Sequence, residues 1–233
     1  KTPSLCRSLL ACGLVLLGSL ANAQAIDYPA RTIKFVVPFP SGSGTDQAAR
    51  EAATDITRRT GQPVIVENKP GANGLIAAQQ VARAAPDGYT VFITSMTTQS
   101  VNPFLYKKLP YDPVADFIPV AMISKTVMVL VVRNTEDQPK SVAELTARMQ
   151  AAGSKLSFAS GNTSSLVAGK TYSNAVSSPA LHVPYKGIPQ AVTDLMAGAV
   201  DFMFSDLTVA NPLVQQGRLR GLGVTGPTRA STL

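Results

Sequence analysis

Strand-like and helix-like patterns alternate along almost the whole chain, and this alternation limits the folds that it can adopt. The run "TIKFVVPF" at 32–39 is apolar and rich in β-branched residues, and the helical pattern that follows it stops at Gly61. A short strand "PVIV", a helical "LIAAQQVARAA" and a strand "YTVFITS" continue the order. Short connections between such elements are typical of βαβ units, in which an open parallel sheet is covered by helices on both faces.

A segment with four prolines, "NPFLYKKLPYDPVADFIPVAMIS", interrupts this alternation near the middle of the chain. A strong strand pattern, "VMVLVVRN", follows it, and a second alternating set then runs as far as "LRGLGVTG". The sequence therefore predicts an α/β protein with two lobes, each an open, mostly parallel sheet flanked by helices. We place the first lobe at residues 24–125 and the second at 126–220.

The first 23 residues have the pattern of a secretory signal peptide. Lys1 and Arg7 precede the apolar run 9–20, and small residues fill positions 21–23. Such a leader is removed on export, so we expect the mature chain to begin near Gln24 in the periplasm. A lipoprotein signal centred on Cys12 fits less well, because most of the apolar run follows this cysteine.

Composition narrows the function classes for the mature chain. Both cysteines, Cys6 and Cys12, lie in the leader, so we expect no disulfide and no cysteine metal site after cleavage. Removing Lys1 and Arg7 leaves 19 basic against 14 acidic residues, which lowers the net charge from +7 to +5. The basic residues are scattered without a stripe or aromatic platforms, which argues against nucleic-acid binding. No later segment is long enough to insert in a membrane.

A glycine-rich turn follows the first strand and leads into a helix. Glycines let the backbone approach a ligand, and the helix N-terminus offers free N–H groups to an anion. The Walker and Rossmann glycine patterns are both absent, so a nucleotide phosphate is not expected. An ordinary structural turn remains the alternative for this loop alone. Its candidate ligand-binding residues are Phe39, Pro40, Ser41, Gly42, Ser43, Gly44, Thr45 and Asp46.

The second lobe repeats this arrangement in "SFASGNTSSLVAG". Ligands of open α/β sheets bind at the carboxyl ends of the strands, so two such lobes predict a cleft with donors on both walls. Asp206 ends another strand at the same edge, where it could orient a ligand hydroxyl or amine or could act as a helix N-cap. The candidate residues of the second loop are Ser160, Gly161, Asn162, Thr163, Ser164 and Ser165.

Catalysis has little support in the sequence. His182 is the single histidine and lies within an apolar strand pattern, which favours a structural role. Ser43 lacks the glycine spacing of a nucleophile elbow, and the carboxylates are not paired. Lys186 could supply a cation to an acidic ligand, although a surface lysine is the ordinary expectation. We predict binding without reaction, no metal site and no cofactor.

Several longer motifs carry a resemblance to a known family. "YPARTIKFVVPFPSGSGTDQAAR", "GQPVIVENKPGANG", "APDGYTV", "NPFLYKKLPYDPVADFIPV", "VPYKG" and "DLMAGAVDFMFSDL" resemble the Bug family, the solute-binding receptors of tripartite tricarboxylate transporters. The resemblance covers essentially the whole chain after the leader. One departure is Ser43, which separates two glycines that are usually adjacent in the family's first loop.

The resemblance implies a two-lobed periplasmic receptor of type II, with no enzymatic activity, that closes on a carboxylated solute held by both strand-end loops. Its partners would be a small carboxylate and the membrane subunits of a transporter, and we expect a monomer. The family also returns to its first lobe after "LRGLGVTG", so residues 221–233 are predicted to begin a return whose remainder is missing here. A periplasmic sensor for a two-component system and, more distantly, a periplasmic hydrolase are the alternatives.

Overall fold

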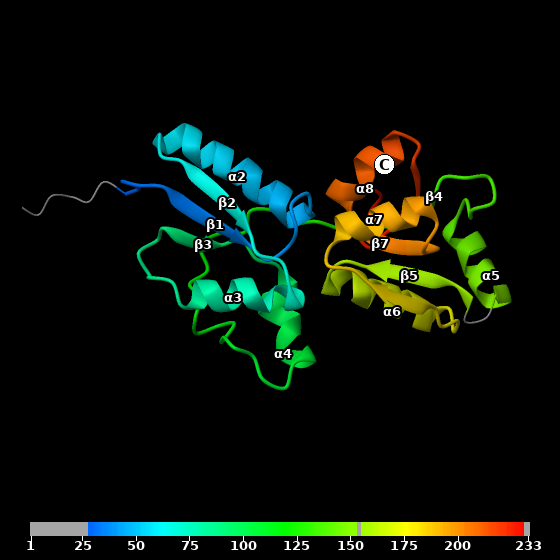
Figure 1. Ribbon diagram of the computed structural model, residues 1–233. Coiled ribbons are helices and arrows are strands. Elements are labelled where there is room, and N and C mark those ends of the chain that lie inside the picture. Colours follow the sequence, from blue (N-terminus) through cyan, green and yellow to red (C-terminus); the bar gives the residue numbers. More distant parts are fainter. Residues whose placement is uncertain (1–27, 153–154, 231–233) are drawn as a thin grey trace, which may run out of the picture.

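The computed structural model describes residues 28–152 and 155–230, which form two lobes that each contain one β-sheet (Figure 1). The first sheet has the strand order β2-β1-β3, and the second has the order β6-β5-β7-β4-β8. The prediction of a two-lobed α/β fold is confirmed. The predicted leader at 1–23 and both cysteines lie outside the described residues.

The first lobe is built around a parallel sheet whose central strand is the apolar run identified in the sequence. Both neighbouring strands run parallel to this strand. Its side chains Ile33, Phe35 and Val37 pack with Ala49 and Ala53 of the covering helix. The elements are β1 (Ile33–Val37), α2 (Gly44–Thr60), β2 (Val64–Asn68), η2 (Ala72–Gly74), α3 (Leu75–Ala82), β3 (Thr90–Phe92), the π-helical η3 (Thr97–Val101) and α4 (Asn102–Leu105).

The proline-rich segment joins the lobes without forming a helix or strand between Leu105 and Met128 in the described chain. Phe117 stacks on Phe92 with ring centroids 5.5 Å apart, which holds part of the segment against the first lobe. Several of its apolar side chains, together with Phe104 of α4, are 81–89% exposed: Phe104, Val114, Ile118 and Val120.

The second lobe holds a mixed sheet. β5 is parallel to β6 and to β7, whereas β4 is antiparallel to β7 and β8. The prediction of a mostly parallel sheet therefore describes the first lobe fully and the second only in part. The elements are β4 (Met128–Arg133), α5 (Val142–Ala152), β5 (Ser157–Ser160), α6 (Thr163–Ala175), β6 (Leu181–Pro184), α7 (Ile188–Ala197), β7 (Phe202–Asp206), α8 (Leu207–Gln215) and β8 (Leu219–Val224).

The last strand belongs to the second sheet. β8 pairs with β4 from Leu219 to Val224, and the Thr225 N–H donates to the Met128 carbonyl. The sequence placed the end of the second lobe at residue 220, which is too early because the pairing continues through Val224.

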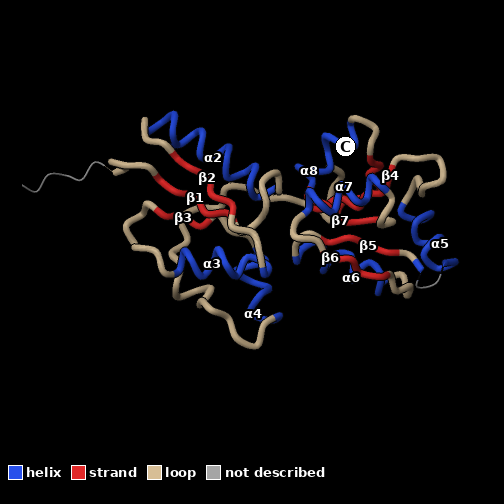
Figure 2. The backbone as a smooth tube through the Cα atoms, in the orientation of Figure 1, coloured by secondary structure: helices blue, strands red, loops and turns tan. Residues whose placement is uncertain are grey.

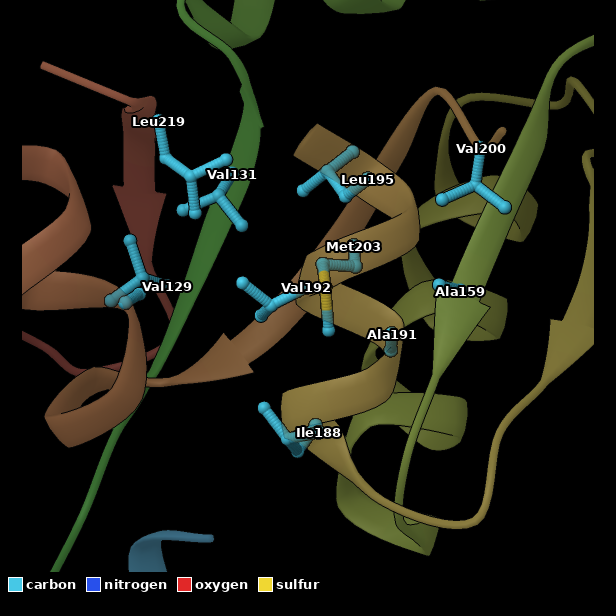
Figure 3. Close-up of a cluster of buried hydrophobic side chains, with 11 residues drawn as sticks. Val129, Val131, Ala159, Ile188, Ala191, Val192, Leu195, Val200, Met203 and Leu219 are labelled. Carbon is cyan, nitrogen blue, oxygen red and sulfur yellow. The ribbon is translucent and has the colours of Figure 1, made fainter. Parts of the chain in front are cut away.

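Both faces of the second sheet are buried, and β4 illustrates the consequence. Val129 and Val131 face a core built with α7 and α8, which Figure 3 shows around Val192 and Leu195. Met128, Leu130 and Val132 face the opposite core, with α5 and α6. Because successive side chains of a strand point to opposite faces, a strand covered on both sides reads as a continuous apolar run.

The carboxyl ends of β1, β5 and β7 bring their loops to the interface between the lobes. The tan loops after β1 and β5 lie near this boundary in Figure 2. Helix α2 of the first lobe contacts α8 of the second. Within residues 28–152 and 155–230, none of the helices combines the length and apolar character that crossing a bilayer requires.

Candidate functional site

The first loop, residues 39–46, makes a turn that starts helix α2. Gly42 has φ of +81°, in the left-handed region that glycine adopts without strain. Ser43 is the N-cap, and its Oγ accepts a hydrogen bond from the Asp46 N–H at 3.3 Å. Ser43, which stands between Gly42 and Gly44, thus begins the helix. Phe39 is buried in the first core, while Pro40 and Thr45 are half-buried.

Asp46 organises this loop from inside. Its carboxylate is 2% exposed and accepts hydrogen bonds from the Gly42 N–H (2.9 Å), Arg50 Nε (3.0 Å) and Asn68 Nδ2 (2.9 Å). Burial by itself raises the pKa of Asp46, but the hydrogen bonds from these three groups outweigh it and hold the pKa below the usual value. The side chain that the sequence offered as a ligand contact is used to hold the turn.

The second loop, residues 160–165, also begins a helix with a side-chain cap. Asn162 Oδ1 accepts from the Ser165 N–H at 2.8 Å. Ser165 Oγ donates to the Phe204 carbonyl at 2.6 Å, and Ser160 Oγ lies 2.7 Å from His182 Nε2. Ser164 is half-buried. Most polar side chains of this loop therefore bond within the second lobe.

Thr163 is the exception in the second loop. It is the first residue of α6 and is 2% exposed, and its Oγ1 has no hydrogen-bond partner. Buried polar atoms in native proteins almost always have a partner, so an unpaired buried hydroxyl indicates a position where a bound molecule or water completes the bonding.

Gly161 lies against a neighbouring loop of its own lobe. A Cβ at this position would overlap the backbone of Gly187 and Ile188. Gly161 therefore allows two loops of the same lobe to approach closely, and its contact with a ligand stays a prediction.

Asp206 links the two lobes. It precedes α8, but its side chain does not cap that helix. The carboxylate accepts from the Gly44 N–H at the start of α2, and Asn162 Nδ2 lies a long 3.5 Å from its Oδ1. Burial raises the pKa of Asp206, against smaller opposing effects of these two hydrogen bonds. Asp206 therefore occupies the N-cap position that the sequence offered as an alternative, but its carboxylate reaches across the interface and makes no capping bond to α8.

Further contacts bring the first loop onto the second lobe. A Cβ added at Gly187 would lie 2.6 Å from Pro40 Cγ, and one added at Gly44 would lie 3.0 Å from Asp206 Oδ2 and from Thr208 Oγ1. The two glycines thus allow the backbones of the lobes to meet closely. The predicted loops are brought together at one interface.

The third strand end of the first lobe was missed in the sequence. Thr97 follows β3 and is 1% exposed, and its Oγ1 has no partner. The segment "SMTTQS" has the same signal as the two predicted loops, since hydroxyl residues follow a strand. Applying the strand-end rule to every strand would have found it.

Two further residues were considered in the sequence, Lys186 and His182. Lys186 is exposed. The ring of His182 packs on Phe158 at 5.0 Å, and burial, followed by the charge of Lys170, lowers its pKa. Within the described residues, no side chain is hydrogen-bonded to His182 Nδ1, the atom that the third member of a catalytic triad would orient.

Two surface hollows lie away from the predicted loops. One of about 560 Å³ is lined by residues 103–113, and one of about 230 Å³ by residues 136–148. Neither includes a residue of the two loops. In the part of the chain that the structure describes, no group of three His, Cys, Asp or Glu side chains is arranged to hold a metal ion.

Comparison with known proteins agrees with the resemblance in the sequence. Residues 48–233 match the family described as the tripartite tricarboxylate transporter family receptor. Protein BugT of Bordetella pertussis is 32% identical over 218 residues, which are 92% of this chain and 66% of BugT.

Two solved structures from Rhodopseudomonas palustris are similar across most of the chain. Rpa4515 with adipate has a TM-score of 0.84 and 31% identity, covering 87% of this chain and 68% of Rpa4515. MatC with bound malate has a TM-score of 0.79 and 30% identity, covering 87% of this chain and 69% of MatC. The family consists of periplasmic solute-binding receptors and not of enzymes. With most of its length matched, the chain belongs to the tripartite tricarboxylate transporter receptor family, in which the Bug proteins are its relatives.

Proposed function

We propose that this chain is a periplasmic receptor that captures a small carboxylate-containing metabolite and delivers it to the membrane subunits of a tripartite tricarboxylate-type transporter. The observation that carries the proposal is the meeting of two strand-end loops, each starting a helix, at one interface between the lobes. Helix N-termini bind carboxylates through backbone N–H groups and need no metal ion.

The protein's own carboxylate supports this choice of ligand. Asp206 reaches from the second lobe to the Gly44 N–H at the start of α2. A backbone donor of the first loop therefore already accommodates a carboxylate at the interface. Hydrogen bonds between a carboxylate and backbone N–H groups are stronger than neutral ones, and excluding water between closing lobes strengthens them further.

The ligands of the two structurally similar proteins also support a small carboxylate as the ligand of this chain. Adipate and malate are small acids with two carboxylates. We expect this chain to bind a small mono- or dicarboxylate in the space between its lobes.

Calorimetric titration tests the binding step directly. The panel would contain adipate, malate, aromatic acids, nicotinate and amino acids, with uncharged amides of the same acids as controls. We expect saturable binding of at least one acid and no measurable binding of its amide. Equal binding of acid and amide, or no binding by any acid, would contradict the proposal.

Delivery to a transporter needs a cellular test. We expect deletion of the gene to abolish uptake of the radiolabelled acid and re-expression of the chain to restore it. Normal uptake together with loss of an acid-induced transcriptional response would instead support the sensor alternative.

Export and a monomeric state are part of the same proposal. Mass spectrometry of protein from the periplasmic fraction should give an N-terminus near Gln24, and size-exclusion chromatography with light scattering should give the mass of one chain. An N-terminus at Lys1 would contradict cleavage of the leader.

A further inference from the structure

The segment after β3 lies at the edge of the first sheet where the first loop also lies. β3 is parallel to β1, so the carboxyl ends of the two strands share one edge. The Ile93 N–H donates to the Val36 carbonyl at 2.9 Å, which keeps the chain beside β1 as it leaves the sheet. The chain then forms η3, a short π-helix, and such π-helical turns are frequent at functional sites.

Two neighbouring threonines at the start of η3 have opposite bonding. Both are buried, Thr97 at 1% and Thr98 at 0% exposure. Thr98 Oγ1 donates to the Ser95 carbonyl at 3.2 Å and is hydrogen-bonded to Thr94 Oγ1. Thr97 Oγ1 has no partner. Burial of a hydroxyl without a partner is costly, and the fold does not use this hydroxyl for its own bonding.

The second lobe presents a similar hydroxyl on the element that η3 contacts. Helix α6 contacts η3 across the interface, and α6 begins at Thr163. Thr163 Oγ1 is also buried and unpaired. Each of the two contacting elements, one from each lobe, therefore carries a buried hydroxyl that can donate a hydrogen bond.

We propose that Thr97 contacts the ligand and, together with Thr163, holds one carboxylate group of it between the lobes. This inference rests on the proposed function and adds a ligand contact that lies outside the two predicted loops. A carboxylate accepts hydrogen bonds from several donors at once, and two hydroxyls from opposite lobes can both donate to its oxygens. Because the donors belong to different lobes, the bound carboxylate also favours their closed arrangement.

Isosteric substitutions of the two adjacent threonines test the inference. Thr97→Val removes only the hydroxyl, Thr98→Val is the matched control, and Thr97→Ser keeps a hydroxyl. The probes are malate and adipate together with the acid that gives the strongest signal in the panel above. Each variant is measured by calorimetric titration and by thermal unfolding without ligand.

We expect Thr97→Val to weaken binding of the carboxylate by about tenfold or more and to leave the ligand-free melting temperature unchanged or higher. Thr163→Val should behave in the same way, and Thr97→Ser should bind within about threefold of wild type. Thr98→Val should show the reverse pattern, with a lower melting temperature and nearly unchanged affinity, because its hydroxyl is bonded within the lobe.

The outcomes separate this inference from the proposed function. Equal affinities of wild type and Thr97→Val for an acid would overturn the role of Thr97 and leave the receptor function standing. A lower melting temperature for Thr97→Val with unchanged affinity would also overturn it, since the hydroxyl would then be structural. Wild-type protein that binds none of the acids would overturn both.

Discussion

The first loop, residues 39–46, and the second loop, residues 160–165, resemble each other in sequence and position but differ in what their polar groups contact. In the first loop the bonds converge on the buried carboxylate of Asp46. In the second loop they go to other strands, as from Ser165 to the Phe204 carbonyl. Only the second loop leaves a buried hydroxyl unpaired, that of Thr163. Most hydroxyl groups in such a loop therefore stabilise the loop and its surroundings. Only the hydroxyl groups without a partner in the protein are left to bind a ligand.

The glycines of the two loops also differ in what they allow to approach. Gly161 allows another loop of its own lobe to approach, whereas Gly44 allows the opposite lobe to approach. Substitution of the first should affect folding of one lobe, and substitution of the second should affect how the lobes meet. This difference can be measured.

The largest effect is expected for Gly161→Val. The new side chain would overlap the backbone of Gly187 and Ile188, which cannot move away as a flexible side chain could. We expect the free energy of unfolding to fall by about 3 kcal/mol, as measured by urea denaturation. Gly223→Ala is the control, since its Cβ would meet only Val142 Cγ2 at 3.3 Å. A Gly161 variant as stable as wild type would contradict the close approach.

Asp46→Asn should have the next largest effect. The substitution keeps the size of the side chain but removes the charge that Arg50 contacts, and it places an amide where only acceptors fit. We expect a loss of about 1–3 kcal/mol of unfolding free energy at pH 7. Because the pKa of Asp46 is lowered by folding, its stabilisation is present above pH 3.8 and is lost as the pH falls through the folded pKa. Wild type and variant should therefore converge in stability in acid, and a constant difference would contradict this account.

The sequence predicted the alternation of elements because each strand and helix has a local signature. The stop at Gly61 is such a local feature, and it is found in the structure. The direction of β4 is not local. "MVLVVR" reads as a strand with both faces buried whether its neighbours are parallel or antiparallel, and its pairing depends on β7 and β8, far along the chain.

The same limit applies to the candidate site. Composition identified the loops that meet at the interface, but it could not distinguish Thr163 from Ser165. The two hydroxyls differ because that of Ser165 donates a hydrogen bond to the Phe204 carbonyl, which is 39 residues away in the sequence. Asp206 was open between two roles for a similar reason, because its partner Gly44 belongs to the other lobe.

Gly44→Ala sharpens the contrast with Gly161. The added methyl group would meet Asp206 Oδ2 and Thr208 Oγ1 at 3.0 Å, so the lobes would have to separate slightly. We expect carboxylate affinity to fall by about threefold to tenfold, or about 0.7–1.4 kcal/mol, while the melting temperature changes little. Calorimetry and thermal unfolding measure the two effects. A large loss of stability with unchanged affinity would place the effect of Gly44 within the first lobe.

The smallest effect is expected for Asp206→Asn and concerns pH. Folding raises the pKa of Asp206 above its ordinary value near 3.8, mainly through burial. Between these two values the folded state binds more protons than the unfolded state, so this group makes the unfolding free energy fall as the pH rises. Asparagine cannot titrate and still offers an oxygen to the Gly44 N–H. The variant should therefore lose less stability than wild type as the pH rises above 3.8 towards neutrality. Asp137→Asn is the control with the opposite sign, because hydrogen bonds from Thr135 and Gln138 lower the pKa of Asp137. Parallel pH profiles for wild type and Asp206→Asn would mean that the carboxylate does not lie buried between the lobes in solution, and the contact that distinguishes the first loop from the second would be lost.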